Sequence, residues 1–194
     1  MAEPAAVVAT ADEDRAIATL TTAFANDAVT RWFLRDAHFY LTYWPQLTRA
    51  LGGAAFQGGT ADSIDDHAGV ALWLAPGVSS DDEAIGALAV DAVPEDQRDE
   101  IFAFMTQVAE FHPHDPHWYL ALLGVDPVKQ GRGCGSALLV HGLDRCDRDG
   151  LPAYLEASSP RNKALYARHG FEEIGVIQAG SSPPMFPMVR SARP

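Results

Sequence analysis

Apolar residues recur along the chain with two different patterns, which together predict a mixture of helices and strands. Ile17, Leu20 and Phe24 are spaced by three and four residues, as on one face of a helix. The run WYLALLGV, residues 118–125, is continuously apolar, as expected of a strand buried on both faces. Across the chain, the patterns predict helices over 12–26, 38–51, 136–146 and 160–169, helices that begin at 79–83 and at Pro94, and strands over 6–10, 54–60, 67–76, 118–125, 152–158, 171–178 and 185–190.

The order of these elements predicts a mixed sheet in an α/β fold. Four polar residues separate two of the early strands and supply a turn: Asp62, Ser63, Asp65 and Asp66. So short a connection joins antiparallel neighbours. The later strands alternate with helices, so at least one pair of strands is expected to be parallel.

Length and composition are those of an ordinary globular protein. Of the 194 residues, 47% are hydrophobic and 21% are charged, which suits one domain or a core domain with an inserted helical segment. No apolar tract reaches about 18 residues, and the first residues lack a basic region, so neither a membrane span nor a signal peptide is expected. If Cys134 and Cys146 lie on one helix, they are about 18 Å apart, too far for a disulfide. We therefore expect two free thiols and a reducing, cytoplasmic setting.

The balance of charge narrows the choice of partner. The chain has 26 acidic and 14 basic residues, which gives a formal net charge of −12. Such a surface repels the phosphates of nucleic acids, so no nucleic acid partner is expected. It also favours a cationic small substrate, although solubility alone explains the same charge.

Three histidines, His112, His114 and His117, lie close together in the segment FHPHDPH. Neutral imidazoles bind zinc, so a metal site is conceivable. However, Pro113 and Pro116 make this segment a turn, and no clear set of carboxylate or thiol ligands joins it. We therefore interpret them as ordinary loop histidines and predict no metal site.

The segment VDPVKQGRGCGSALL, residues 125–139, has three glycines in five positions between a predicted strand and a predicted helix. It matches neither the P-loop pattern nor the dinucleotide fingerprint of the Rossmann fold. Free backbone N–H groups at a helix N-terminus nevertheless bind phosphate or pyrophosphate, and glycines allow a close approach. A tight turn without a ligand is the alternative.

The residues of this segment match a known motif. Gln130, Gly133 and Gly135 fit the pattern Q/R-x-x-G-x-G/A, the acyl-CoA signature of the GNAT acetyltransferases. About thirty residues later, the runs NKALY (162–166) and Gly170-Phe171 are similar to the second motif of the family. The chain therefore resembles this family. The stretches 117–139 and 154–171 most resemble a member that acetylates an aminonucleoside antibiotic, whereas 35–66 and 77–110 carry little that matches.

The resemblance implies a fold and a mode of cofactor binding. It implies one GNAT-like domain over 1–194 with an acyl-CoA-binding core at about 117–178. The sheet would be twisted, mostly antiparallel and of about six or seven strands, with helices on both faces and a splay between two central parallel strands. Acetyl-CoA would lie in that splay, with its pantetheine arm along the backbone of Leu123 and Val125 and its pyrophosphate on N–H groups of residues 130–136. The implied cofactor-binding residues are Leu123, Gly124, Val125, Gln130, Gly131, Arg132, Gly133, Cys134, Gly135, Ser136, Asn162 and Tyr166.

Acetyl transfer requires a neutral amine, a stabilised oxyanion and a protonated leaving thiolate. The resemblance implies that Tyr166 protonates the sulfur; a phenol with a pKa of about 10 can donate at neutral pH. The alternative for Tyr166 is packing on its helix. Glu156, beside the expected splay, is the first candidate for the base, with a structural glutamate as the alternative; Tyr119 and His117 are further candidates.

The acceptor is expected to be a small primary amine. The aromatic segment 38–44 could line its pocket, or it could form a helix packed on the sheet; the candidate substrate-binding residues are Tyr40, Tyr43, Trp44 and Tyr119. The expected function is N-acetyl transfer from acetyl-CoA by direct attack in a ternary complex, on an aminonucleoside, another antibiotic or a different amine. The alternatives are an acyl-CoA sensor without turnover and O-acetyl transfer. A monomer or a homodimer is expected.

Overall fold

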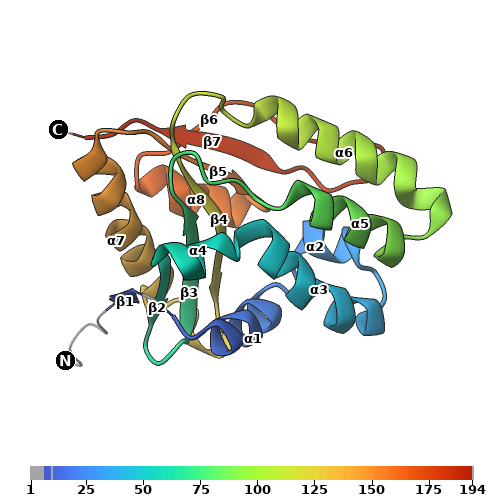
Figure 1. The fold of residues 1–194 in the computed structure, drawn as a ribbon, viewed down its shortest axis with the longest axis horizontal. Helices are drawn as coiled ribbons and strands as arrows, with labels where there is room; N and C mark the ends of the chain where they lie inside the picture. Colours follow the sequence, from blue (N-terminus) through green and yellow to red (C-terminus); the bar gives the residue numbers. More distant parts are fainter. Residues whose placement is uncertain (1–6, 10, 194) are drawn as a thin grey trace.

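Seven strands form one sheet in the computed structural model, which describes residues 7–9 and 11–193 (Figure 1). The strands are β1 (Val7–Ala9), β2 (Ala61–Ile64), β3 (Gly69–Leu74), β4 (Trp118–Val125), β5 (Ala153–Ala157), β6 (Glu172–Glu173) and β7 (Phe186–Arg190). Their order across the sheet is β1-β2-β3-β4-β5-β7-β6. Neighbours are antiparallel except β4 and β5, which are parallel. This confirms the expected mixed, mostly antiparallel sheet.

The two parallel strands stay side by side only at their first residues. Trp118 pairs with Ala153 and Tyr119 with Tyr154, and the described part of the chain has no further pair between these strands. Beyond that point β4 follows β3, whereas β5 follows β7. The strands therefore diverge in the expected splay, and the edge of β4 that faces β5 has no strand partner there.

A β-bulge interrupts β4 just where the splay opens. Two adjacent residues of β3 pair with Leu120 and Leu122, which leaves Ala121 as the extra residue of the bulge. Leu120 and Leu123 are three residues apart and would point to opposite faces of a regular strand. They instead pack in the same hydrophobic cluster, on the side of the sheet covered by the helix that follows β4. The continuous apolar run in the sequence thus reflects this change of face as well as burial.

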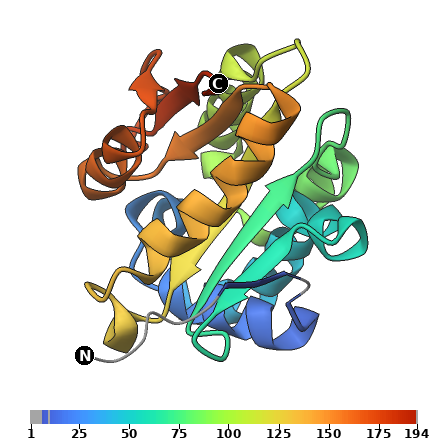
Figure 2. The ribbon, with the colours of Figure 1, turned by 90° about the vertical axis from the view of Figure 1, so that its left-hand side faces the viewer.

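Helices cover both faces of the sheet, as expected. They are α1 (Glu13–Ala23), α2 (Ala28–Phe33), α3 (Ala37–Gly52), α4 (Ala54–Gly58), α5 (Asp82–Ala92), α6 (Arg98–Phe111), α7 (Cys134–Asp149) and α8 (Pro160–Arg168), with single 3₁₀ turns at Glu95–Gln97 and Pro127–Lys129. Figure 2 looks onto the face where α7 crosses in front of the sheet, with α8 beside it. Helices α1, α3, α5 and α6 lie on the opposite face (Figure 1).

The helix boundaries follow from local sequence signals. Aspartates precede α1, α2, α3 and α5, and each accepts a hydrogen bond from a first-turn N–H group: Asp12, Asp27, Asp36 and Asp81. Ser159 does the same for α8, which begins with Pro160. Pro45 lies inside α3, so the proline does not divide that predicted helix.

Two predicted strands are wrong in whole or in part. The predicted strand 54–60 is instead the short helix α4 (Ala54–Gly58) and the turn after it, because Gly53 keeps helical dihedral angles and the chain turns only at Gly59, with φ of 67°. The strand follows at 61–64, so Asp62 and Ser63 belong to it, and the turn is made by residues 65–67 with positive φ. Of the predicted strand 171–178, only Glu172–Glu173 belongs to a strand, and Ile177 forms an isolated bridge with Met185.

Asp62 is fully buried, which a turn residue would not be. Its two carboxylate oxygens accept hydrogen bonds of 2.6 and 2.7 Å from Arg145 on α7, and His141 Nε2 lies 3.6 Å away. The ion pair compensates for burial of the charge and fastens α7 to the sheet.

The cysteine prediction is confirmed in part. Cys134 and Cys146 are both buried and free. Burial raises the pKa of the Cys146 thiol to about 12, so this thiol stays neutral.

None of the described helices is long and apolar enough to cross a membrane.

Candidate active site

The diverging part of β4 and β5 forms the centre of the candidate site. Leu123, Gly124 and Val125 lie there and pair with β3 on one side only. A Cβ atom on Gly124 would come within 2.9 Å of side chains of α1, so glycine allows this helix to pack closely on the strand. The backbone edge of β4 toward β5 is therefore suited to an extended ligand that pairs as an added strand.

The glycine-rich loop leads from this edge into α7. Gly131 and Gly133 have φ of 76° and 90°, a region that favours glycine, and a Cβ atom on either would meet no atom within 4 Å. Gly133 precedes α7, and no described side chain caps this helix. The first helical hydrogen bond runs from Ala137 N to Gly133 O, so the preceding N–H groups of α7 are available to an anion.

Two side chains of the predicted cofactor set hold this loop in place. Gln130 Nε2 donates to the carbonyl oxygen of Val125 at 3.1 Å, which ties the loop to the end of β4. Ser136 Oγ lies 2.6 Å from His169 Nε2, which ties the start of α7 to the end of α8. The sequence interpretation missed His169. Burial, followed by the charges of nearby arginines, lowers the pKa of His169, so its ring is neutral at neutral pH.

The second motif lies on α8 beside the same loop. Asn162 Nδ2 donates to Ser158 Oγ at 3.3 Å, and Ser158 Oγ donates to Asp27 Oδ2. The other carboxylate oxygen of Asp27 caps α2. This chain of contacts joins α8, the end of β5 and the α1–α2 connection, and it includes Asp27 and Ser158, which the sequence interpretation did not identify.

Tyr166 lies one turn after Asn162 and is 7% exposed. Its ring packs on Phe171, with centroids 6.0 Å apart, in the hydrophobic cluster on the α7 side of the sheet. Burial, and next the negative charge of Asp27, raise the pKa of Tyr166 above its ordinary value. The phenol is therefore protonated at neutral pH and can donate a proton.

Glu156 belongs to a buried polar cluster on the opposite face of the sheet. Its side chain is 7% exposed, and Oε2 accepts a hydrogen bond of 2.9 Å from the Tyr119 hydroxyl. Oε1 is buried and has no hydrogen-bond partner among the described residues, and the same holds for the Tyr154 hydroxyl. Burial and the charge of Glu156 raise the pKa values of Tyr119 and Tyr154, so both hydroxyls remain protonated. A buried carboxylate oxygen without a partner is suited to accept a proton or an N–H group.

Two of the three loop histidines cover this cluster. The ring of His112 packs edge-on against Tyr119 and Tyr154, with centroids 4.8 and 5.0 Å apart, and His117 packs against His112. His114 is exposed. Within residues 7–9 and 11–193, no group of three or more His, Cys, Asp or Glu side chains is arranged to hold a metal ion.

The aromatic segment of α3 lies mostly in the core. Tyr40 and Trp44 are 3% and 6% exposed, and the Tyr40 hydroxyl donates to the backbone of Thr21. Tyr43 is half-buried and packs on Phe39. These contacts favour the packing alternative for Tyr40 and Trp44. Of the four predicted substrate-binding residues, only Tyr119 is brought to Glu156.

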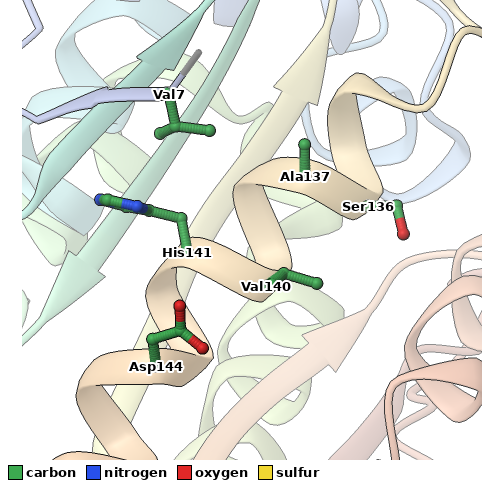
Figure 3. A pocket seen from close by; sticks show the side chains of 6 residues that line it. All are labelled: Val7, Ser136, Ala137, Val140, His141 and Asp144. Carbon is green, nitrogen blue, oxygen red and sulfur yellow. The ribbon is translucent and has the colours of Figure 1, made fainter. Parts of the chain in front are cut away.

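A separate cavity of about 410 Å³ lies along α7 toward β1 (Figure 3). Its lining consists of Val7, Ser136, Ala137, Val140, His141 and Asp144. In Figure 3, Ser136 points away from Val7 and His141. Ser136 is the only lining residue that belongs to the predicted cofactor set, so this cavity is distinct from the splay.

Comparisons with known proteins agree with this arrangement. Residues 26–171 match the family model for the acetyltransferase (GNAT) family. An uncharacterized N-acetyltransferase of Schizosaccharomyces pombe is 26% identical over 196 residues, which cover 92% of this chain and 79% of that protein.

Solved structures show the same fold. One from Corynebacterium glutamicum, named as histone acetyltransferase HPA2 and related acetyltransferase, is 27% identical, with a TM-score of 0.70 and 98% of both chains covered. Arylalkylamine N-acetyltransferase 2 of Aedes aegypti is 12% identical, with a TM-score of 0.67 and 97% of this chain and 99% of that chain covered. At that identity, the second likeness concerns the fold alone.

Proposed function

The chain belongs to the acetyltransferase (GNAT) family and is an acyltransferase; from this premise we propose that it transfers an acetyl group from acetyl-CoA to a primary amine of a small molecule. The transfer would occur by direct attack in a ternary complex. The observation that carries the proposal is the placement of Glu156 and Tyr166. They lie on opposite faces of the sheet, one with a buried carboxylate oxygen that has no partner among the described residues and one with a protonated phenol.

The residues around the splay fit the acyl donor. The free edge of β4 at Leu123 and Val125 would pair with the pantetheine arm, and N–H groups from Gln130 to Ser136 would bind the pyrophosphate. Asn162 would hold the donor from α8. When bound, acetyl-CoA supplies the activated thioester.

The proposed chemistry divides between three groups of this chain. Glu156 Oε1 accepts a proton from the amine, while the Tyr119 hydroxyl holds Oε2 in place. A backbone N–H near Val125 holds the oxygen on which negative charge develops. The Tyr166 hydroxyl donates its proton to the leaving sulfur.

The acceptor is proposed from charge and from relatives. A net charge of −12 and a buried carboxylate at the site favour a cationic amine. Proteins of similar fold include an agmatine N-acetyltransferase and an arylalkylamine N-acetyltransferase. The narrower likeness to puromycin N-acetyltransferase in 117–139 and 154–171 has no support from the relatives described above, so an antibiotic acceptor and a role in resistance rest on that likeness alone.

The domain organisation, the oligomeric state and the cellular location are also proposals. We take residues 1–194 as one domain whose acyl-CoA-binding core spans about 117–178, acting as a monomer or a homodimer. The two free thiols support a reducing, cytoplasmic location.

A screen of amines with acetyl-CoA tests the proposal, with release of the CoA thiol as the readout. The library should include putrescine and phenethylamine, hydroxyl compounds, and peptides with free N-termini or lysines. Turnover of small primary amines is the expected result. Reaction of peptides or hydroxyl compounds alone would contradict the small-amine acceptor, and calorimetric binding of acetyl-CoA without thiol release would favour a sensor.

A further inference from the structure

We propose that His112 and His117 form a proton relay that carries the proton of the acceptor from Glu156 to solvent. The inference rests on the proposed function of Glu156 as the base, and it assigns a role to the histidines of the α6–β4 loop. His112 directly follows α6 and His117 directly precedes β4, so both rings are held at the cluster by adjacent elements. In this role both histidines act through Glu156 and do not touch the acceptor.

The backbone determines which nitrogen of each ring carries a proton. His117 Nδ1 lies 2.8 Å from the carbonyl oxygen of Asp115, and a carbonyl only accepts, so Nδ1 of His117 carries the proton. In the neutral ring Nε2 is then an acceptor. It lies 3.2 Å from Nε2 of His112, which must therefore donate. As a result, Nδ1 of neutral His112 has a free lone pair.

That lone pair faces Glu156. Nδ1 of His112 lies 4.0 Å from Oε1 of Glu156, the carboxylate oxygen that has no partner among the described residues. Both atoms are acceptors while the carboxylate is charged, and two acceptors without a proton between them do not form a hydrogen bond. A proton added to Oε1 turns it into a donor toward Nδ1, and the transfer requires the two atoms to move from 4.0 Å to hydrogen-bond distance. His112 Nδ1 can therefore accept a hydrogen bond from Glu156 only when Glu156 is protonated, and the proposed reaction produces that protonated state.

The protons balance over the three steps. The N–H bond of the ammonium or amine breaks and an O–H bond forms at Glu156 Oε1. That O–H bond then breaks as Nδ1 of His112 is protonated, and His112 passes its Nε2 proton to Nε2 of His117. His117 then carries protons on both nitrogens and loses its Nε2 proton to water. His112 is left with its proton on Nδ1 and returns to the Nε2–H tautomer by exchanging protons with water. The side chain of His112 is 36% exposed and His117 is half-buried, so both rings can exchange protons with water.

The surroundings favour return of the relay to its neutral state. The titratable groups that face the two rings are Tyr119 on β4 and Tyr154 and Glu156 on β5, and the charge of Asp82 on α5 acts on Tyr119. Burial is the largest effect and lowers the pKa of His117, and the charge of His112 lowers it further. The hydrogen bond to the Asp115 carbonyl and the charge of Glu156 oppose these effects. His117 therefore releases its proton readily at neutral pH.

Aromatic packing alone would also place these rings here, so the test must separate packing from proton transfer. The first measurement is ring ¹⁵N NMR of the full chain, which needs no turnover. We expect the Nε2–H tautomer for His112 and the Nδ1–H tautomer for His117. An Nδ1–H tautomer at His112 would overturn the relay, because the lone pair would then be absent from the side of Glu156.

The second measurement uses His112→Gln and His117→Asn, with His114→Asn as the matched control from the exposed part of the same loop. The assay contains acetyl-CoA and whichever of putrescine or phenethylamine the unaltered chain acetylates. In weakly buffered solution we expect kcat of the two relay variants to fall by about tenfold, part of the range known for general acid–base steps, with an unchanged KM for the amine. Added free imidazole should restore kcat, and the control should match the unaltered chain.

The outcomes distinguish this proposal from the proposed function. Turnover of an amine by the unaltered chain, with relay variants that keep full kcat or that imidazole does not restore, would overturn the relay and leave the function intact. If the unaltered chain acetylates no amine while the NMR tautomers are as expected, the proposed function fails and the relay loses its proton source with it.

Discussion

Replacing Tyr166 by Phe isolates the proposed proton donor from the packing of its ring. The ring is 7% exposed and packs on Phe171 at an angle of 65° between the ring planes, contacts that phenylalanine retains. Only the hydroxyl is lost. We expect the free energy of unfolding to change by no more than about 1 kcal/mol, since one hydroxyl contributes about that much. Affinity for acetyl-CoA should also be retained.

The expected effect on turnover follows from the role of the phenol. A positioned acid contributes roughly 10²–10⁴-fold to the rate. Because each factor of ten corresponds to about 1.4 kcal/mol of activation free energy, the variant should lose about 3–5 kcal/mol of transition-state stabilisation. The loss should appear in kcat, because the sulfur requires a proton only as it leaves.

The pH dependence of the unaltered chain gives a second readout. Burial and the charge of Asp27 both raise the pKa of Tyr166, and the protonated phenol is the form proposed to act. Activity due to this group is therefore fully present at neutral pH and is lost only as pH rises through the raised pKa. We expect no decline of kcat from this group below about pH 10, the ordinary value for tyrosine.

Thiol release measures kcat, calorimetry measures acetyl-CoA binding, and urea unfolding measures stability. Tyr40→Phe is the matched control, because it removes a buried hydroxyl that donates to the backbone of Thr21. This control should lose about 1 kcal/mol of stability and keep kcat. Full turnover by Tyr166→Phe, or an alkaline limb near neutral pH that disappears in that variant, would refute the reasoning.

Three further predictions concern the base, the loop and the core. Glu156→Gln cannot accept a proton, so kcat/KM should fall by about 10²-fold or more and the acidic limb of the pH–rate profile should disappear; a retained acidic limb would exclude Glu156 as the base. Gly133→Ala, at φ of 90°, should cost about 1–2 kcal/mol of stability in urea unfolding and weaken acetyl-CoA binding in calorimetry. Asp62→Ala leaves Arg145 without its buried partner and should cost about 3 kcal/mol, or about 6–12 °C in Tm. As the control for Asp62→Ala, Asp65→Asn breaks only the exposed pair with Lys129 and should change stability by less than about 1 kcal/mol.

Elements with strong local signals could be predicted from the sequence. The apolar run of β4, the helical spacing in α7 and the cap and proline at the start of α8 all act within a few residues, so a short window contains the cause. Residues 54–60 could not be read in this way, since alanine and glycine carry little periodicity and the helical path of Gly53 decides the outcome. For Asp62 and Ser63, polar side chains suggested a turn, whereas an arginine 83 residues later in the chain compensates for the burial of Asp62.

The sequence by itself determined the family resemblance and the two motifs, because Gln130, Gly133, Gly135, Asn162 and Tyr166 lie at short, regular spacings. The tertiary structure decided which strands and side chains surround these motif residues. The bulge in β4 and the divergence of β5 depend on pairing across the sheet.

The contact between Ser158 and Asp27 joins residues 131 positions apart, and the one between Glu156 and His112 depends on how the α6–β4 loop folds back over β5. Contacts of this kind arise from long-range packing, and no local pattern of residues encodes them. The sequence therefore predicted a donor site and an acid, whereas the surroundings of the proposed base emerged only when distant segments packed together.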